Sequence, residues 1–188
     1  MIGPANRVID KPCTSTICSV NRFSSGWSFS RSWPPRYGDS AFFVLVDVAA
    51  AALRELRPDA VISGMALGWD QALAAAAVQV GIPFDAAIPF KGQEATWPVA
   101  SQARYQELLF HARNVVYVCD PGYAAWKLQR RNEWMCDHAT GLIVMHNGDK
   151  QVGTWNCLEY ARSIGKPVVR NCYQDWLSAA RERANPNR

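Results

Sequence analysis

The sequence predicts an α/β protein in which helices cover both faces of one mainly parallel sheet. Two observations predict this class. From Ile62 onward, short runs rich in Val and Ile alternate with segments of helical period, and turn residues separate them. The 188 residues, 49% of them hydrophobic and 19% charged, also suffice for one core of ordinary size. We therefore expect one domain over residues 39–188, preceded by an irregular segment of residues 1–38.

The expected strands are short apolar runs without alternation, as in strands that are buried on both faces. In chain order they are Ala60–Ser63, Phe84–Ile88, Asn114–Cys119, Leu142–His146 and Pro167–Arg170. Residues 1–38 are instead rich in Ser, Pro, Trp and Arg. Within them only Ile17–Val20 and Trp27–Ser30 resemble strands.

The segments around these strands have helical period. The expected helices are Ser40–Leu56, Trp69–Val80, Val99–Ala112, Ala124–His138, Trp155–Ile164 and Tyr173–Arg183. Two boundaries do not depend on periodicity, because Gly81 and Gly165 follow helices while Pro83 and Pro167 precede strands.

Composition limits the partners of the protein. Lys and Arg number 20 against 16 Asp and Glu, so the formal net charge is +4, and it is dispersed along the chain. This charge suits a small anionic ligand better than a nucleic-acid duplex. There is no apolar run of about 18 residues and no secretory signal in Met1–Val20, so we expect a cytoplasmic protein without a membrane span.

The cysteines and histidines do not indicate metal chemistry. The six cysteines include no CxxC pair, so free buried thiols are favoured over a zinc site or a disulfide framework. The three histidines show neither HxxxH nor HxH spacing. We expect neither a bound metal nor a cofactor.

The sharpest local feature is a buried strand that runs through a glycine turn into an alanine-rich helix. Gly64, Met65 and Gly68 lie in the turn, and Asp70 lies in the first turn of the helix. Glycine lets the backbone approach a ligand closely, and the free N–H groups of a helix N-terminus attract phosphate. Asp70 is interpreted either as a partner of a sugar hydroxyl or as a complement to the helix dipole.

A second glycine-containing turn follows the strand Leu142–His146. Gly153, Thr154 and Asn156 lie where the next helix starts, and Thr154 is interpreted as an N-cap, a ligand contact or both. Two such turns at the carboxyl ends of parallel strands are typical of a phosphate or ribose site.

The helix Ala124–His138 carries a candidate anion contact. Arg131, beside Asn132, is the better candidate for a bidentate phosphate contact, while Arg130 is expected to face solvent. Its large apolar residues recur at helical spacing and are expected in the core: Trp126, Trp134 and Met135.

A third loop is expected at the same rim, after the strand that ends at Ile88. It contains Pro89, Phe90, Gly92 and Trp97. Phe90 or Trp97 either stacks on a base or closes the edge of the core.

Four segments together are similar to a known family. GMALGWDQALA, PFKGQEATW, GYAAWKLQRRNEWMCD and GTWNCLEYA, within about Pro58 to Val169, resemble the YspA/YpsA-like branch of the SLOG superfamily. This superfamily includes the Smf/DprA proteins and the LOG-type phosphoribohydrolases. The resemblance implies a single Rossmann-like, doubly wound domain with a nucleotide or nucleotide-derived ligand at the strand ends.

The N-terminal segment departs from the family pattern, in which a first strand leads into a TGHRP-like loop. The nearest stretch here is Ser30–Pro34, which lacks the Gly and the His. An alternative places the first strand at Thr16–Val20, with Asn21 and Arg22 in the loop. Both placements remain open at the level of sequence.

The catalytic residues of LOG-type enzymes are matched only in part. These enzymes carry a PGGxGTxxE pattern and an Arg on the preceding helix, which Arg131 matches. The position of the Glu holds Cys157, and Glu159 stands two residues further, about 200° around a helix. Asp70 is the other candidate for a carboxylate that stabilises oxocarbenium-like charge.

We expect a protein that binds a nucleotide or nucleotide derivative, with the glycine turns around its phosphate. The expected ligand contacts are Gly64, Met65, Gly68, Asp70, Pro89, Phe90, Gly92, Trp97, Arg131, Asn132, Gly153, Thr154 and Asn156. In this interpretation Arg131 clamps the anion, and Asp70 and Asn156 contact the ribose.

Two other classes of function stay open. One is a nucleotide N-glycoside hydrolase, with Asp70 or Glu159 as the acid and Arg131 orienting the phosphate. The other is a single-stranded nucleic-acid-binding module, which the dispersed charge disfavours. The eight tryptophans exceed what a core of this size needs, so self-association through an apolar surface patch is a further expectation.

Overall fold

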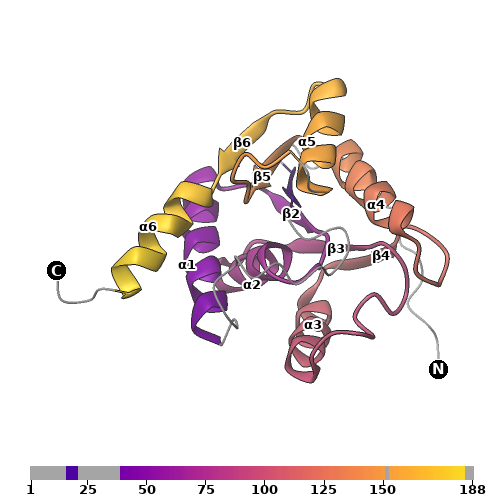
Figure 1. The fold of residues 1–188 in the computed structure, drawn as a ribbon, viewed down its shortest axis with the longest axis horizontal. Helices are drawn as coiled ribbons and strands as arrows, with labels where there is room; N and C mark the ends of the chain where they lie inside the picture. Colours follow the sequence, from indigo (N-terminus) through magenta and orange to yellow (C-terminus); the bar gives the residue numbers. More distant parts are fainter. Residues whose placement is uncertain (1–15, 21–38, 151–152, 185–188) are drawn as a thin grey trace.

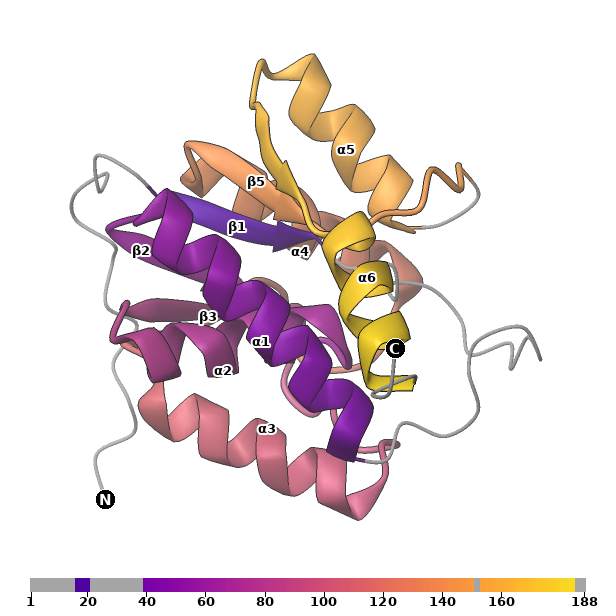
Figure 2. The same ribbon diagram turned by 90° about the vertical axis from the view of Figure 1, so that its left-hand side faces the viewer.

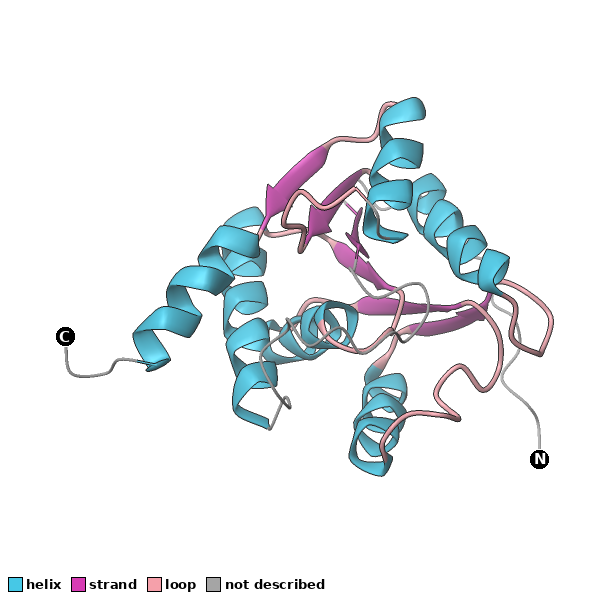
Figure 3. Cartoon of the chain, in the orientation of Figure 1, coloured by secondary structure: helices cyan, strands magenta, loops and turns pink. Residues whose placement is uncertain are grey.

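The computed structural model describes residues 16–20, 39–150 and 153–184. Within these ranges strands and helices alternate along the chain and build one sheet with helices around it (Figure 1; Figure 3). The strands are β1 (Thr16–Val20), β2 (Ala60–Ser63), β3 (Phe84–Ile88), β4 (Asn114–Tyr117), β5 (Gly141–Val144) and β6 (Val168–Asn171). The helices are α1 (Asp39–Leu56), α2 (Trp69–Val80), α3 (Val99–His111), α4 (Ala125–His138), α5 (Gly153–Ser163) and α6 (Tyr173–Ala184).

The six strands have the order β4-β3-β2-β1-β5-β6, and every neighbouring pair is parallel. The predicted parallel sheet is therefore confirmed. From β1 the chain moves through α1 to β2 on one side, whereas the other neighbour of β1 is β5. The strand order thus reverses between β1 and β5, which in open α/β sheets is where ligands bind, outside the carboxyl ends of the strands.

Helices cover both faces of the sheet, as the doubly wound class requires. On one face α1 contacts α2 and α6, and α2 contacts α3 (Figure 2). On the other face α4 packs against α5. Each face has its own buried apolar cluster: the larger includes residues of α1, α2, α3 and α6, and the smaller includes residues of α4 and α5.

Glycine and proline residues mark where helices end and the following strands begin. Gly81 adopts the left-handed conformation with φ of 76° directly after α2, which glycine does without steric cost. β2, β3 and α2 match their predicted bounds residue for residue.

The strand at Thr16–Val20 confirms one of the two placements of the first strand. The residues Asn21, Arg22, Trp27–Ser30 and Ser30–Pro34 lie outside the described ranges.

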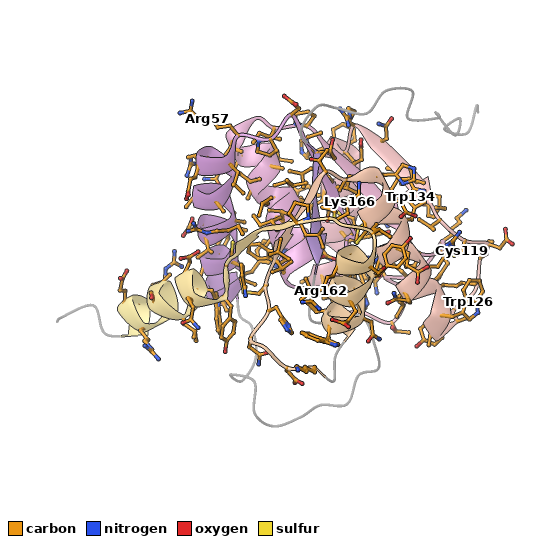
Figure 4. All side chains as sticks on the ribbon, turned by 90° about the horizontal axis from the view of Figure 1, so that it is seen from above. Arg57, Cys119, Trp126, Trp134, Arg162 and Lys166 are labelled. Atoms are coloured by element: carbon orange, nitrogen blue, oxygen red, sulfur yellow. The ribbon has the colours of Figure 1, made fainter. Side chains whose placement is uncertain are left out.

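Two expectations about burial are wrong. β4 and β6 are not buried on both faces, because they are the edge strands of the sheet and their side chains are partly exposed. Trp126 is 63% exposed and lies at the periphery, not in the core (Figure 4). It stands in the first turn of α4, whereas Met135, further along the same helix, is buried as expected.

None of the helices in the described ranges is both long and apolar enough to cross a membrane.

Candidate functional site

The turn between β2 and α2 is closed by its own hydrogen bonds. Ser63 Oγ donates to the Asp70 carbonyl at 2.8 Å and accepts from the Met65 N–H at 3.1 Å. The Ala66 N–H donates to Asp70 Oδ2 at 3.3 Å. Met65 has φ of 56°, a left-handed conformation that costs a residue with a side chain about 1 kcal/mol or more. The turn is thus held in one strained conformation at the carboxyl end of β2.

Arg131 lies under this turn and is only 1% exposed. Its Nη1 donates to the Gly64 carbonyl and lies 3.7 Å from Asp70 Oδ2, and its Nε donates to Asn132 Oδ1 at 2.9 Å. A Cβ on residue 64 would lie 2.7 Å from both Arg131 Cζ and Asp70 Oδ2. Gly64 is therefore required by the buried guanidinium, which the sequence did not reveal.

The charges around Arg131 connect several elements. Burial lowers the pKa of the guanidinium, while Asp70, Cys157 and Tyr105 act in the opposite direction. These three groups come from α2, α5 and α3, so residues of three other helices act electrostatically on this cation of α4. Because a guanidinium keeps its proton in proteins, Arg131 and the 1% exposed Asp70 form a buried ion pair.

The start of α5 faces the same edge of the sheet. Gly153 and Thr154 are both buried. Because α5 begins at Gly153, Thr154 is inside the helix and is not its N-cap. Thr154 is 0% exposed, and its Oγ1 has no hydrogen-bond partner among the described residues. A buried hydroxyl without a partner costs about 1–3 kcal/mol, which makes this position unusual.

The sheet brings the two glycine turns close together. β1 pairs with β2 on one side and with β5 on the other. Neighbouring strands are about 4.8 Å apart, so the carboxyl ends of β2 and β5 are about 10 Å apart across β1.

Two predicted residues of α5 lie on its outer side. Asn156 is exposed, and Glu159 is exposed and paired with Arg162. Cys157 is completely buried, so the expectation that Glu159 points away from Cys157 is confirmed. Glu159 is not part of the cluster around Arg131. Arg130 faces solvent as expected and pairs with Glu133 at 3.4 Å.

The loop after β3 closes an edge of the core. Phe90 is buried and packs edge-to-face on Tyr123, with 5.9 Å between ring centroids. Trp97 packs edge-to-face on the buried Tyr105 at 5.5 Å. Of the two interpretations of these rings, the structure favours the one in which they close the core. Pro89 accepts from the Cys119 N–H at 3.0 Å, and Gly92 has φ of 86° with open space around it.

Lys127 fixes a loop near the strand ends, a role that the sequence analysis did not identify. Its buried Nζ donates to the carbonyls of Asp120, Pro121 and Gly122 at 2.8, 3.2 and 2.8 Å. Three carbonyls of one loop thus converge on a single ammonium group, which fixes the loop between β4 and α4. The Asp-Pro-Gly segment at residues 120–122, together with a lysine at 127 in the first turn of the next helix, was the available signal.

Two surface pockets lie apart from the Arg131 cluster. One, of about 390 Å³, is lined by residues at the carboxyl end of β4, including Lys91, Tyr117 and Cys119. The other, of about 430 Å³, lies between the ends of α1 and α2, beside Leu53 and Ile82. Neither is lined by the predicted ligand contacts.

The thiols are free in the part of the chain that the structure describes. Four of these cysteines are buried and Cys119 is half-buried, while Cys13 lies outside the described residues. Among the same described residues, no three or more His, Cys, Asp or Glu side chains are arranged to hold a metal ion.

Comparison with known proteins identifies relatives of this chain. The chain is 34% identical over 118 residues to the uncharacterized SPbeta prophage-derived protein YoqJ of Bacillus subtilis, covering 54% of this chain and 68% of YoqJ. It is 34% identical over 64 residues to a UPF0398 protein of Shouchella clausii, and this match covers 34% of each chain.

The fold also matches a solved structure, DNA processing protein A (DprA) from Streptococcus pneumoniae, with a TM-score of 0.56 and 20% sequence identity. The match covers 90% of this chain but only 56% of the DprA chain, and at this identity the likeness concerns the fold alone. The model of the YspA SLOG family matches residues 50–165, which run from α1 through β2, the Arg131 helix and α5. The chain therefore belongs to the YspA SLOG family.

Proposed function

We propose that this protein binds a nucleotide or nucleotide-derived small ligand at the carboxyl end of β1. The phosphate lies between the β2–α2 turn and the first turn of α5. Both helices begin at this edge, and helix N-termini attract anions through their free N–H groups and their dipoles. The position between β1 and β5 is also where the order of the sheet reverses.

The observation that carries the proposal is the Thr154 hydroxyl. It is completely buried and has no partner among the described residues, although buried hydroxyls are nearly always hydrogen-bonded. A phosphate oxygen at the start of α5 accepts from this hydroxyl and from the neighbouring N–H groups. The ligand thereby removes a cost that the free protein carries.

Arg131 supports the anion from behind the turn. Its guanidinium is held by Gly64 and Asp70, so its charge is fixed at the base of the site. Because Asp70 offsets part of this charge, Arg131 acts mainly by holding the β2–α2 turn and its amides in one conformation at the site. In this proposal Asp70 orients Arg131, and Asn156, on the exposed side of α5, is available to the sugar.

Binding is favoured over hydrolysis because of where the carboxylates lie. Asp70 is 1% exposed and engaged by Arg131 and the Ala66 N–H, while Glu159 faces solvent with Arg162. A hydrolase of nucleotide N-glycosidic bonds needs a carboxylate at the sugar to stabilise oxocarbenium-like charge. Neither side chain is placed for that role.

Calorimetric titration of the full chain with nucleoside monophosphates and NAD derivatives tests the proposal. We expect saturable binding that weakens about tenfold or more in Thr154→Val, the scale of one hydrogen bond to a charged group. Thr140→Val is the matched control, since Thr140 precedes β5 at the opposite edge of the sheet and bonds Thr16. It should leave the affinity unchanged.

Chromatography of the same mixtures separates the alternatives. Intact nucleotide after prolonged incubation supports binding, whereas released free base would establish a hydrolase. If no mononucleotide binds but single-stranded DNA is retained with a steep salt dependence, the nucleic-acid-binding alternative replaces the proposal.

A further inference from the structure

Three thiols meet in the core on the α4–α5 face of the sheet. Cys18 comes from β1, Cys136 from α4 and Cys157 from α5, and each is 0% exposed. All three belong to the smaller apolar cluster. The Sγ atoms of Cys136 and Cys157 are 3.5 Å apart, which is direct contact between side chains of two different helices.

The thiols are not equivalent. Hydrogen bonds from Cys157 and Cys18 lower the pKa of the Cys136 thiol to about 4. The same hydrogen bonds, together with burial, raise the pKa values of Cys18 and Cys157. The direction of these shifts favours ionisation at Cys136, with Cys157 as the protonated thiol in contact with it. A thiolate beside a second thiol is the arrangement in which oxidation ends in a disulfide.

We propose that Cys136 and Cys157 are a hydroperoxide-sensitive pair that closes to a disulfide between α4 and α5. This modification site does not depend on the proposed nucleotide ligand. The Sγ–Sγ separation has to shrink from 3.5 Å to about 2.05 Å. Closure requires rotation of the two side chains or a shift between α4 and α5.

Hydrogen peroxide supplies the oxidising equivalents. The Cys136 thiolate attacks one peroxide oxygen, the O–O bond breaks, and hydroxide leaves while Cys136 becomes a sulfenic acid. The Cys157 sulfur then attacks the Cys136 sulfur, the S–O bond breaks, and the departing hydroxide takes the Cys157 proton to form water. The two thiols lose two electrons in total, and the peroxide gains them.

The experiment treats the folded full chain with hydrogen peroxide, removes the oxidant, denatures the protein and alkylates the remaining thiols. Trypsin then yields residues 132–150 and 151–162, each with a single cysteine. We expect these two peptides to be linked, to lack the alkyl groups and to be released by a reductant. The linked species should have lost two hydrogen atoms.

The variants locate the bond. Cys157→Ala should abolish the linkage and leave a sulfenic acid at Cys136 that dimedone traps, and Cys136→Ala should abolish both signals. Cys119→Ser is the matched control, since Cys119 is half-buried in the loop before α4 and should not change the linkage. The wild-type measurement stands even if a core variant fails to fold.

Several results would overturn the proposal. One is that both peptides remain fully alkylated after peroxide treatment of the folded protein. Another is that Cys136 is linked to a cysteine other than Cys157. A third is that the linkage forms only in protein unfolded by urea, because the folded contact between α4 and α5 would then play no part.

Discussion

Replacing Arg131 by Met removes the cation from the buried cluster while keeping a side chain of similar length. The Asp70 carboxylate, 1% exposed and 3.7 Å from Nη1, then lacks its guanidinium. The Gly64 carbonyl also loses its hydrogen bond. Removing one partner of a buried ion pair costs about 3–5 kcal/mol. For a chain of this size, 1 kcal/mol corresponds to about 2–4 °C, so we expect the melting temperature to fall by about 6–20 °C.

The neighbouring arginine provides the control. Arg130 stands on the same helix but is exposed, and its pair with Glu133 at 3.4 Å lies in solvent. Exposed pairs contribute at most about 1 kcal/mol, so Arg130→Met should change the melting temperature by a few degrees at most. Urea unfolding and thermal unfolding monitored by circular dichroism measure both variants. Equal effects of Arg130→Met and Arg131→Met would refute the buried pair.

Three further predictions concern the surroundings of the site. Gly64→Ala places a methyl group against Arg131 and Asp70 and should lower the free energy of unfolding in urea by about 1–3 kcal/mol; full stability would show that the turn is not closed on the guanidinium. Lys127→Met frees three carbonyls of the loop 120–122 and should cost about 1–3 kcal/mol in the same assay, with faster hydrogen exchange confined to that loop; an unchanged loop would contradict the role of Lys127. Burial raises the pKa of Cys172 to about 12, so the folded protein keeps this thiol protonated where an unfolded chain, with a thiol pKa of about 8.5, would lose the proton. The stability that the protonated thiol contributes is therefore present below about pH 8.5 and is lost as the pH rises toward 12. Cys172→Ala should therefore show a smaller decrease of the unfolding free energy over that pH range, and an identical decrease would contradict the shift.

The sequence predicted best the elements whose ends are marked by glycine or proline. β2 ends directly before Gly64, the alanine-rich α2 lies between Gly68 and Gly81, and β3 follows Pro83, so pattern and turn chemistry agree there. The first strand was ambiguous for a physical reason. It is only five residues long, and the pairing that holds it between β2 and β5 is made by residues far away in the chain.

Helical periodicity did not predict which residues of α4 are covered. Periodicity shows which side chains share one face of the helix, but it does not show which part of that face is covered by the sheet. Trp126, in the first turn, is 63% exposed, while the charged Lys127 beside it is buried by three carbonyls. A buried lysine with such partners breaks the rule that charge lies outside, so helical periodicity alone places it on the wrong side.

The sequence predicted that the two glycine turns lie at one edge of the sheet but not how the first turn is packed. The structure places both turns beside β1, and ligand binding there stays a prediction. Gly64 was interpreted as a close approach of backbone and ligand, whereas its neighbour is Arg131, 67 positions further along the chain. A contact over such a separation depends on the fold and cannot be inferred from a local motif.

An NMR titration of the uniformly ¹⁵N-labelled 188-residue chain with a nucleoside monophosphate that binds in calorimetry tests the shared site. We predict that the amide signals of Gly68, in the β2–α2 turn, and of Gly153 and Thr154, at the start of α5, shift together. Their shifts should follow one curve with a single dissociation constant, because one phosphate contacts both turns. Shifts confined to one turn, or two different dissociation constants, would contradict the claim that the turns form one site.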